Sequence, residues 1–131
     1  MKTSISIILT VCAVALATTG FAQEPIAITE AVICKGIQDR EPVEAGDVFS
    51  NEVGKVYFFN RSSAVAKTTI KHVWYLEGEK RAGVTLNIGA SPSWRTSSSK
   101  TIRPIDTGLW RVNVLGPDEE LLETATFVIQ E

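Results

Sequence analysis

Only two side chains outside the first 22 residues combine a thiol or an imidazole with nucleophilic or general-base chemistry, Cys34 and His72. Acyl-transfer catalysis would need one of them beside a partner base and an orienting group. In "TTIKHVWYL" strand alternation places His72 on the same side as Ile70 and Trp74. We therefore expect a core histidine rather than a catalytic base, and a small buried hydrophobe at Cys34. One His and one Cys cannot complete a tetrahedral metal shell.

Four carboxylates cluster in "DREPVEAGD" and raise the question of a calcium site: Asp39, Glu41, Glu44 and Asp47. Hard cations take oxygen ligands from such loops. The spacing matches no calcium-binding loop, however, and Arg40 competes for the same charges. We expect an ordinary solvated loop here, with no metal and no cofactor.

The stretch "WRTSSSK", residues 94–100, is unusual because six hydroxyl-bearing or charged residues follow Trp94 without a break. One interpretation is an edge strand, whose hydroxyls and lysine discourage pairing with another chain. The other is a binding strip, in which an aromatic face and polar groups meet a sugar or a peptide backbone. The candidate binding residues are Trp94, Arg95, Ser97, Ser99 and Lys100, joined by Tyr75 and Lys71 if their strand lies alongside.

Short runs rich in Val, Ile, Thr and aromatic residues recur between turn sequences, whereas no stretch after residue 22 sustains helical spacing. The runs predict strands near 27–37, 54–60, 68–76, 82–88, 95–103, 109–115 and 121–129. This pattern is typical of an all-β fold, an immunoglobulin-like antiparallel β-sandwich of about seven strands without helices. Residues 23–131 then form a single domain.

Strand alternation also predicts the core. Trp74 on the third strand and Trp110 with Val112 on the sixth face inward. "DTGLWRV", which starts at Asp106, resembles the corner that opens strand F of immunoglobulin domains, with Trp110 in place of the usual Tyr and Val112 in place of the Cys. We expect Asp106, Trp74, Trp110 and Val112 to be structural residues.

Residues 1–22 read as a cleavable signal peptide. Lys2 precedes an apolar run, and Gly20 and Ala22 are the small residues that signal peptidase requires, so cleavage is expected between Ala22 and Gln23. The product would be periplasmic or secreted. A net charge of −2 with mixed signs gives no footprint for nucleic acid, and no basic tract or long apolar segment predicts membrane insertion of the mature chain.

Five blocks stand in the order, and near the spacing, of a bacterial family: "AVICKGIQDREPV", "GKVYFF", "HVWYLEG", "WRTSSSK" and "TGLWRVNVL". The chain resembles the family called domain of unknown function 2914 over about residues 31–129, with Ser97 where a bulkier residue is expected. The resemblance implies a small all-β domain, often carried by exported or membrane-attached bacterial proteins. It implies no assigned activity and no catalytic residues.

These patterns favour an exported, non-enzymatic binding or interaction module of the bacterial cell envelope, with a protein or an envelope glycan as its partner. One alternative is a small hydrolase-type enzyme built around His72. A second alternative is a purely structural component of an envelope assembly. A pocket that holds His72 with a carboxylate would favour the first alternative, and a flat apolar patch would favour the second.

Overall fold

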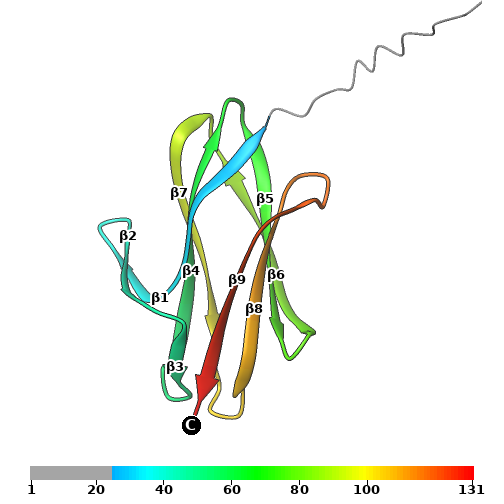
Figure 1. The fold of residues 1–131 in the computed structure, drawn as a ribbon. Coiled ribbons are helices and arrows are strands. Elements are labelled where there is room, and N and C mark those ends of the chain that lie inside the picture. The colour runs from blue at the N-terminus through cyan, green and yellow to red at the C-terminus, as the bar shows by residue number, and fades with distance from the viewer. Residues whose placement is uncertain (1–24) are drawn as a thin grey trace, which may run out of the picture.

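The structure, a computed structural model, describes residues 25–131, which fold into two packed β-sheets (Figure 1). The proposed signal peptide and its cleavage site lie outside the described residues. Residues 25–131 contain no helix, and so none that could cross a membrane. The strands are β1 (Ile26–Gln38), β2 (Glu41–Ala45), β3 (Val48–Ser50), β4 (Lys55–Ala64), β5 (Thr68–Leu76), β6 (Glu79–Ile88), β7 (Ser91–Thr101), β8 (Gly108–Leu115) and β9 (Leu121–Gln130).

The strand order matches an immunoglobulin-like sandwich. One sheet has the order β2-β1-β4-β7 and the other has the order β3-β9-β8-β5-β6. All pairings are antiparallel except that of β3 with β9, which is parallel. The central strand β8 lies between β9 and β5, as strand F lies between G and C in immunoglobulin domains. The all-β sandwich predicted from the sequence is confirmed, with nine strands in place of about seven.

Of the two additional strands, β2 lies in the segment that was expected to be a solvated loop, residues 39–47, and β3 follows directly after it. β2 pairs with the end of β1 as a hairpin, and β3 adds to the edge of β9. The hairpin turns through Asp39 and Arg40, which both have positive φ (51° and 62°). Two such residues define a type I′ turn, whose twist matches that of the flanking strands. The sequence pattern missed this hairpin because the turn contains no glycine.

Aromatic rings fill the space between the two sheets. The Trp110 and Phe127 rings are stacked, with centroids 5.8 Å apart, and the Trp74 ring meets Phe127 edge-on at 6.2 Å. Trp74, Trp110 and Val112 are all buried, in agreement with the faces assigned from strand alternation. These contacts place the core between β5, β8 and β9 on one side and β4 on the other.

The corner before β8 is built around a tryptophan. The indole N–H of Trp110 donates to the carbonyl oxygen of Asp106 at 2.9 Å, four residues upstream. The Asp106 carboxylate is buried and accepts from the backbone N–H of Arg103 and from the guanidinium groups of Arg103 and Arg81, each at 2.9 Å. Hydrogen bonds from Arg103 hold the pKa of Asp106 well below its usual range. The indole therefore replaces the tyrosine hydroxyl as a donor, while the carboxylate fixes the corner.

Candidate functional site

His72 belongs to a buried polar chain that joins the two sheets. Its imidazole comes from β5, and both ring nitrogens bond to strands of the other sheet: Nδ1 to Ser98 Oγ at 2.6 Å and Nε2 to Asn60 Oδ1 at 2.5 Å. The Asn60 amide nitrogen donates to the carbonyl oxygen of Phe59, so its oxygen faces the ring. Nε2 therefore carries the proton and Nδ1 accepts from the serine hydroxyl. Burial lowers the pKa of His72 to about 4, so the ring is neutral at pH 7.

The order Ser98–His72–Asn60 has the donors and acceptors of a catalytic triad, but not its surroundings. A nucleophile needs space for a substrate beside it. The imidazole and the Asn60 side chain have no exposed surface, and neither His72 nor Ser98 lines any of four well-formed cavities among residues 25–131. Ser98, His72 and Asn60 therefore form a hydrogen-bonded bridge between the two sheets, as expected of a histidine in the core.

The outer face of the four-stranded sheet carries an ion cluster that holds the β1–β2 hairpin. Glu41 of the hairpin accepts from Arg61 of β4 at 2.9 Å and from Arg95 of β7 at 2.7 Å. These two hydrogen bonds lower the pKa of the Glu41 carboxyl. Arg61 also bonds Glu30 of β1 at 2.9 Å, and Phe59, on the same face, is buried. Arg95 and Glu41 are therefore both engaged within the protein.

The candidate binding strip on β7 divides between two sides of an edge strand. β7 pairs with β4 alone. Trp94 and Lys100 share with Ser98 the side of β7 that faces the sandwich interior, and Lys100 Nζ lies 6.0 Å from the Trp110 ring centroid. Arg95, Ser97 and Ser99 point to the outer face. The edge position is the one that the first interpretation of this stretch required.

Tyr75 and Lys71 do not join these residues. Both lie on β5, in the other sheet, and by alternation face away from the interior that β7 lines. The Arg111 guanidinium stacks on Tyr75, with its central carbon 4.4 Å from the ring centroid. Lys71 forms an ion pair with Glu119 at 3.0 Å. The seven predicted binding residues therefore form no single surface.

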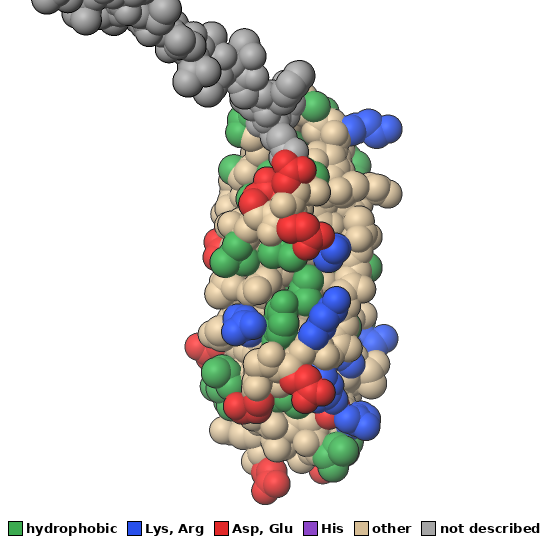
Figure 2. All heavy atoms as spheres, turned by 90° about the vertical axis from the view of Figure 1, so that its right-hand side faces the viewer, with side chains coloured by type: hydrophobic (Ala, Val, Ile, Leu, Met, Phe, Trp, Pro, Cys, Tyr) green, Lys and Arg blue, Asp and Glu red, His purple; other side chains and the backbone are tan. Residues whose placement is uncertain are grey.

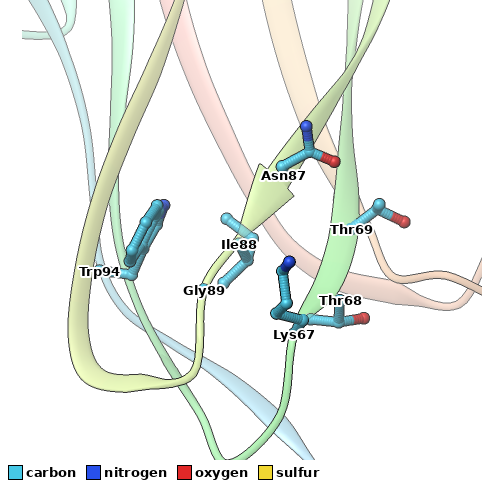
Figure 3. A pocket seen from close by; sticks show the side chains of 7 residues that line it. All are labelled: Lys67, Thr68, Thr69, Asn87, Ile88, Gly89 and Trp94. Atoms are coloured by element: carbon cyan, nitrogen blue, oxygen red, sulfur yellow. The ribbon is translucent and has the colours of Figure 1, made fainter.

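Trp94 is the one candidate that lines a sizeable cavity. The cavity, of about 550 Å³, lies where β5 begins, β6 ends and β7 begins. Figure 3 shows the Trp94 ring on one side, Ile88 and Gly89 next to it, and Lys67 across from it. The indole is 38% exposed. It lies so close to Gly89 that a Cβ built there would be 2.4 Å from a ring carbon. Only glycine leaves room for the ring in this position.

The other residues that line the Trp94 cavity are polar, and none of them is acidic. They are Lys67, Thr68, Thr69 and Asn87. None was predicted from the sequence, because they are spread over two strands that meet only after folding. The one available signal was Gly89, five residues before a tryptophan.

The surface charges are mixed on the face that Figure 2 shows. Lys and Arg side chains are interspersed there with Asp and Glu, so the face has no electrostatic potential of a single sign.

Neither Cys34 nor the carboxylates form a reactive or metal-binding centre in the part of the chain that the structure describes. Cys34 is buried on β1, and burial raises the pKa of its thiol, so the thiolate is scarce at neutral pH. Within residues 25–131 no group of three or more His, Cys, Asp or Glu side chains is placed to hold a metal ion.

The strand order defines an immunoglobulin-like β-sandwich. Comparison with known proteins connects the chain to a family. The model of the family described as "Protein of unknown function (DUF2914)" matches residues 67–129, that is, from just before β5 to the end of β9. The resemblance inferred from sequence blocks is thus confirmed for these residues, while its earlier part, from residue 31, lies outside the match. Among curated proteins, none matches the chain.

Solved structures share the fold at very low identity. A β-glucosidase from Kluyveromyces marxianus is 6% identical, with a TM-score of 0.50 over 85% of this chain and 15% of the enzyme. A mutant β-glucosidase from Listeria innocua, in complex with laminaribiose, is 9% identical, with a TM-score of 0.51 over 85% of this chain and 16% of the enzyme. The chain thus spans about 15% of the length of the first of these enzymes. Identities this low show a shared fold alone.

Proposed function

We propose that the protein is an exported, non-enzymatic binding module of the bacterial cell envelope, and that its ligand is an envelope glycan that stacks on Trp94. The observation that carries the proposal is the half-exposed indole, seated on Gly89 at a cavity of about 550 Å³. Binding sites for small ligands are concave, within about 300–1,000 Å³, and combine aromatic walls with a few polar groups. The Trp94 cavity has this composition.

The chemistry of the lining favours a sugar. A pyranose ring has an apolar face that can lie on an indole, and its hydroxyls need donors and acceptors at the rim. Thr68, Thr69 and Asn87 are the lining residues that can donate and accept, and Figure 3 shows them across the cavity from the Trp94 ring. Close packing against Gly89 restricts the ring, and such preorganisation reduces the entropy lost on binding.

The His72 alternative receives no comparable support. His72 and Ser98 line none of the cavities found, and the depressed pKa of the ring makes it a weak base. Export to the periplasm or beyond rests on the apolar run and small residues of the first 22 positions.

The test is to titrate the protein with soluble peptidoglycan disaccharides and to measure binding by calorimetry and by tryptophan fluorescence. Trp74 and Trp110 are buried, so a fluorescence change on binding reports mainly on Trp94. Trp94→Ala should weaken binding at least about fivefold, the equivalent of about 1 kcal/mol, with little change in melting temperature. Arg95→Ala is the matched control, because it alters the next residue on the opposite side of β7. Equal affinities for both variants and the parent would refute a site on Trp94.

A further inference from the structure

The two sheets leave two strand edges unpaired on the flank opposite β6 and β7. β1 pairs with β2 only from Cys34 onward, and β9 pairs with β3 only from Val128 onward. Among residues 25–131, the first half of β1 and the first half of β9 therefore have a neighbour on one side only. The two strands lie side by side across the sheets (Figure 1).

A groove separates these edges. It has a volume of about 560 Å³ and is lined from β1, from β9 and from the segment that crosses between the sheets: Ala31, Val32, Ile33, Ala45, Gly46, Asp47, Thr124, Ala125 and Thr126. No side chain of the lining is larger than Ile, and none is Lys or Pro, the residues that commonly protect an edge. The backbone of both strands is therefore open to close approach.

Strand alternation shows which backbone groups face the groove. The Val128 N–H donates to Asp47 O at 2.8 Å, on the side away from β8, so the N–H and C=O groups of Thr126 and Thr124 point the same way. On β1 the Ile33 carbonyl accepts from Gly46 N–H at 2.9 Å, which places the backbone groups of Ala31 on the groove side. These are the residues that line the groove.

The chain's own crossing segment already forms backbone hydrogen bonds with both edges. At the lower end of the groove, Gly46 bonds to β1 and Asp47 bonds to β9, so an extended backbone fits there. The crossing segment does not reach the first half of β9. There the Thr124 N–H donates to the carboxylate of its own neighbour Glu123 at 2.8 Å. A side chain thus occupies the place that a strand partner would take.

We propose that this groove binds an extended peptide segment of a partner protein, which adds to β9 as a strand in line with β3. Main-chain hydrogen bonds to Thr126, and to Thr124 once the Glu123 carboxylate is displaced from its N–H, supply the affinity, as in other cases of strand addition. The two charged groups at the groove, Asp47 and Glu123, are both acidic. The segment therefore carries a Lys or Arg among uncharged, β-branched residues.

Selection from a phage-displayed library of random heptapeptides on the immobilised protein tests the proposal. We expect enriched peptides in which β-branched residues alternate and at least one residue is basic. Thr126→Pro removes the groove-facing N–H at an edge position that tolerates proline, and it should weaken binding of a selected peptide at least about tenfold. Thr126→Val keeps the N–H and should bind within about twofold of the parent.

Amide hydrogen exchange on the unaltered protein provides a second readout that does not depend on whether Thr126→Pro folds. A bound peptide should slow exchange at Thr124 and Thr126, and not at Ala125, whose N–H already points to β8. Failure to enrich any peptide would overturn the proposal. So would a selected peptide that leaves the exchange of both threonine amides unchanged.

Discussion

Protonation of His72 should destabilise the fold in mild acid. Burial lowers the pKa of the folded-state imidazole to about 4 from an ordinary value of 6.5. Between these two values the unfolded chain binds a proton that the folded chain does not, so the free energy of unfolding falls as the pH falls. The stabilisation is complete above about pH 6.5 and is lost by about pH 4.

The magnitude follows from the difference between the two pKa values. A pKa of about 4 in place of 6.5 corresponds to about 3 kcal/mol of unfolding free energy over the whole range, of which about 2 kcal/mol is lost between pH 7 and pH 5. The carboxylates with lowered pKa values, Glu41 and Asp106, contribute chiefly at lower pH. The interval from pH 7 to pH 5 therefore isolates the histidine.

Urea unfolding at pH 7, 6 and 5 measures this loss directly. His72→Gln is the matched variant, because glutamine can still donate and accept a hydrogen bond but does not titrate. Its stability should change by less than about 0.5 kcal/mol over the same interval, whatever its absolute value. A parent protein that is equally stable at pH 7 and pH 5, or a variant with the same slope, would refute the buried, neutral histidine.

Three further predictions concern the core and the leader. Trp74→Ala and Trp110→Ala should each lower the free energy of unfolding by about 3–5 kcal/mol, as measured by urea unfolding, because each leaves a large cavity between the sheets. Cys34 should react with a thiol reagent only after denaturation, and fast labelling of the folded protein would contradict its burial. The exported protein should begin at Gln23 by intact-mass measurement, and a mass that includes Met1 would contradict export.

Period-two alternation was sufficient to predict the sandwich and its core from the sequence. The positions of Trp74, Trp110 and Val112 follow from their neighbours along one strand, and burial of one sheet face fixes that pattern. The β1–β2 hairpin could not be read in the same way. Its turn uses Asp39 and Arg40 at positive φ, and its stabilising contacts join residues distant in sequence, such as Glu41 and Arg95, which lie 54 positions apart.

The binding residues were harder to predict than the fold for a similar reason. Tyr75 and Lys71 were grouped with β7 on the assumption that their strands lie alongside one another, whereas the two strands belong to different sheets. The cavity beside Trp94 instead takes its polar groups from β5 and β6, through residues such as Thr69 and Asn87 that have no distinctive pattern. Strand pairing, which sequence periodicity does not specify, decides which side chains meet.

Some of the polar residues of "WRTSSSK" are engaged by the fold itself. A buried hydroxyl or charge is unfavourable unless it is paired, and two members of this stretch are paired within the protein: Ser98 with His72 across the sheets, and Arg95 with Glu41 of the hairpin. Lys100 lies over the Trp110 ring, as a lysine directed inward from a strand edge that discourages pairing with another chain. Trp94 is the one large apolar side chain of this stretch, and it is partly exposed. The stretch therefore serves both as a protected edge and as the support of one exposed ring, and a ligand of β7 should depend on Trp94 rather than on the serines.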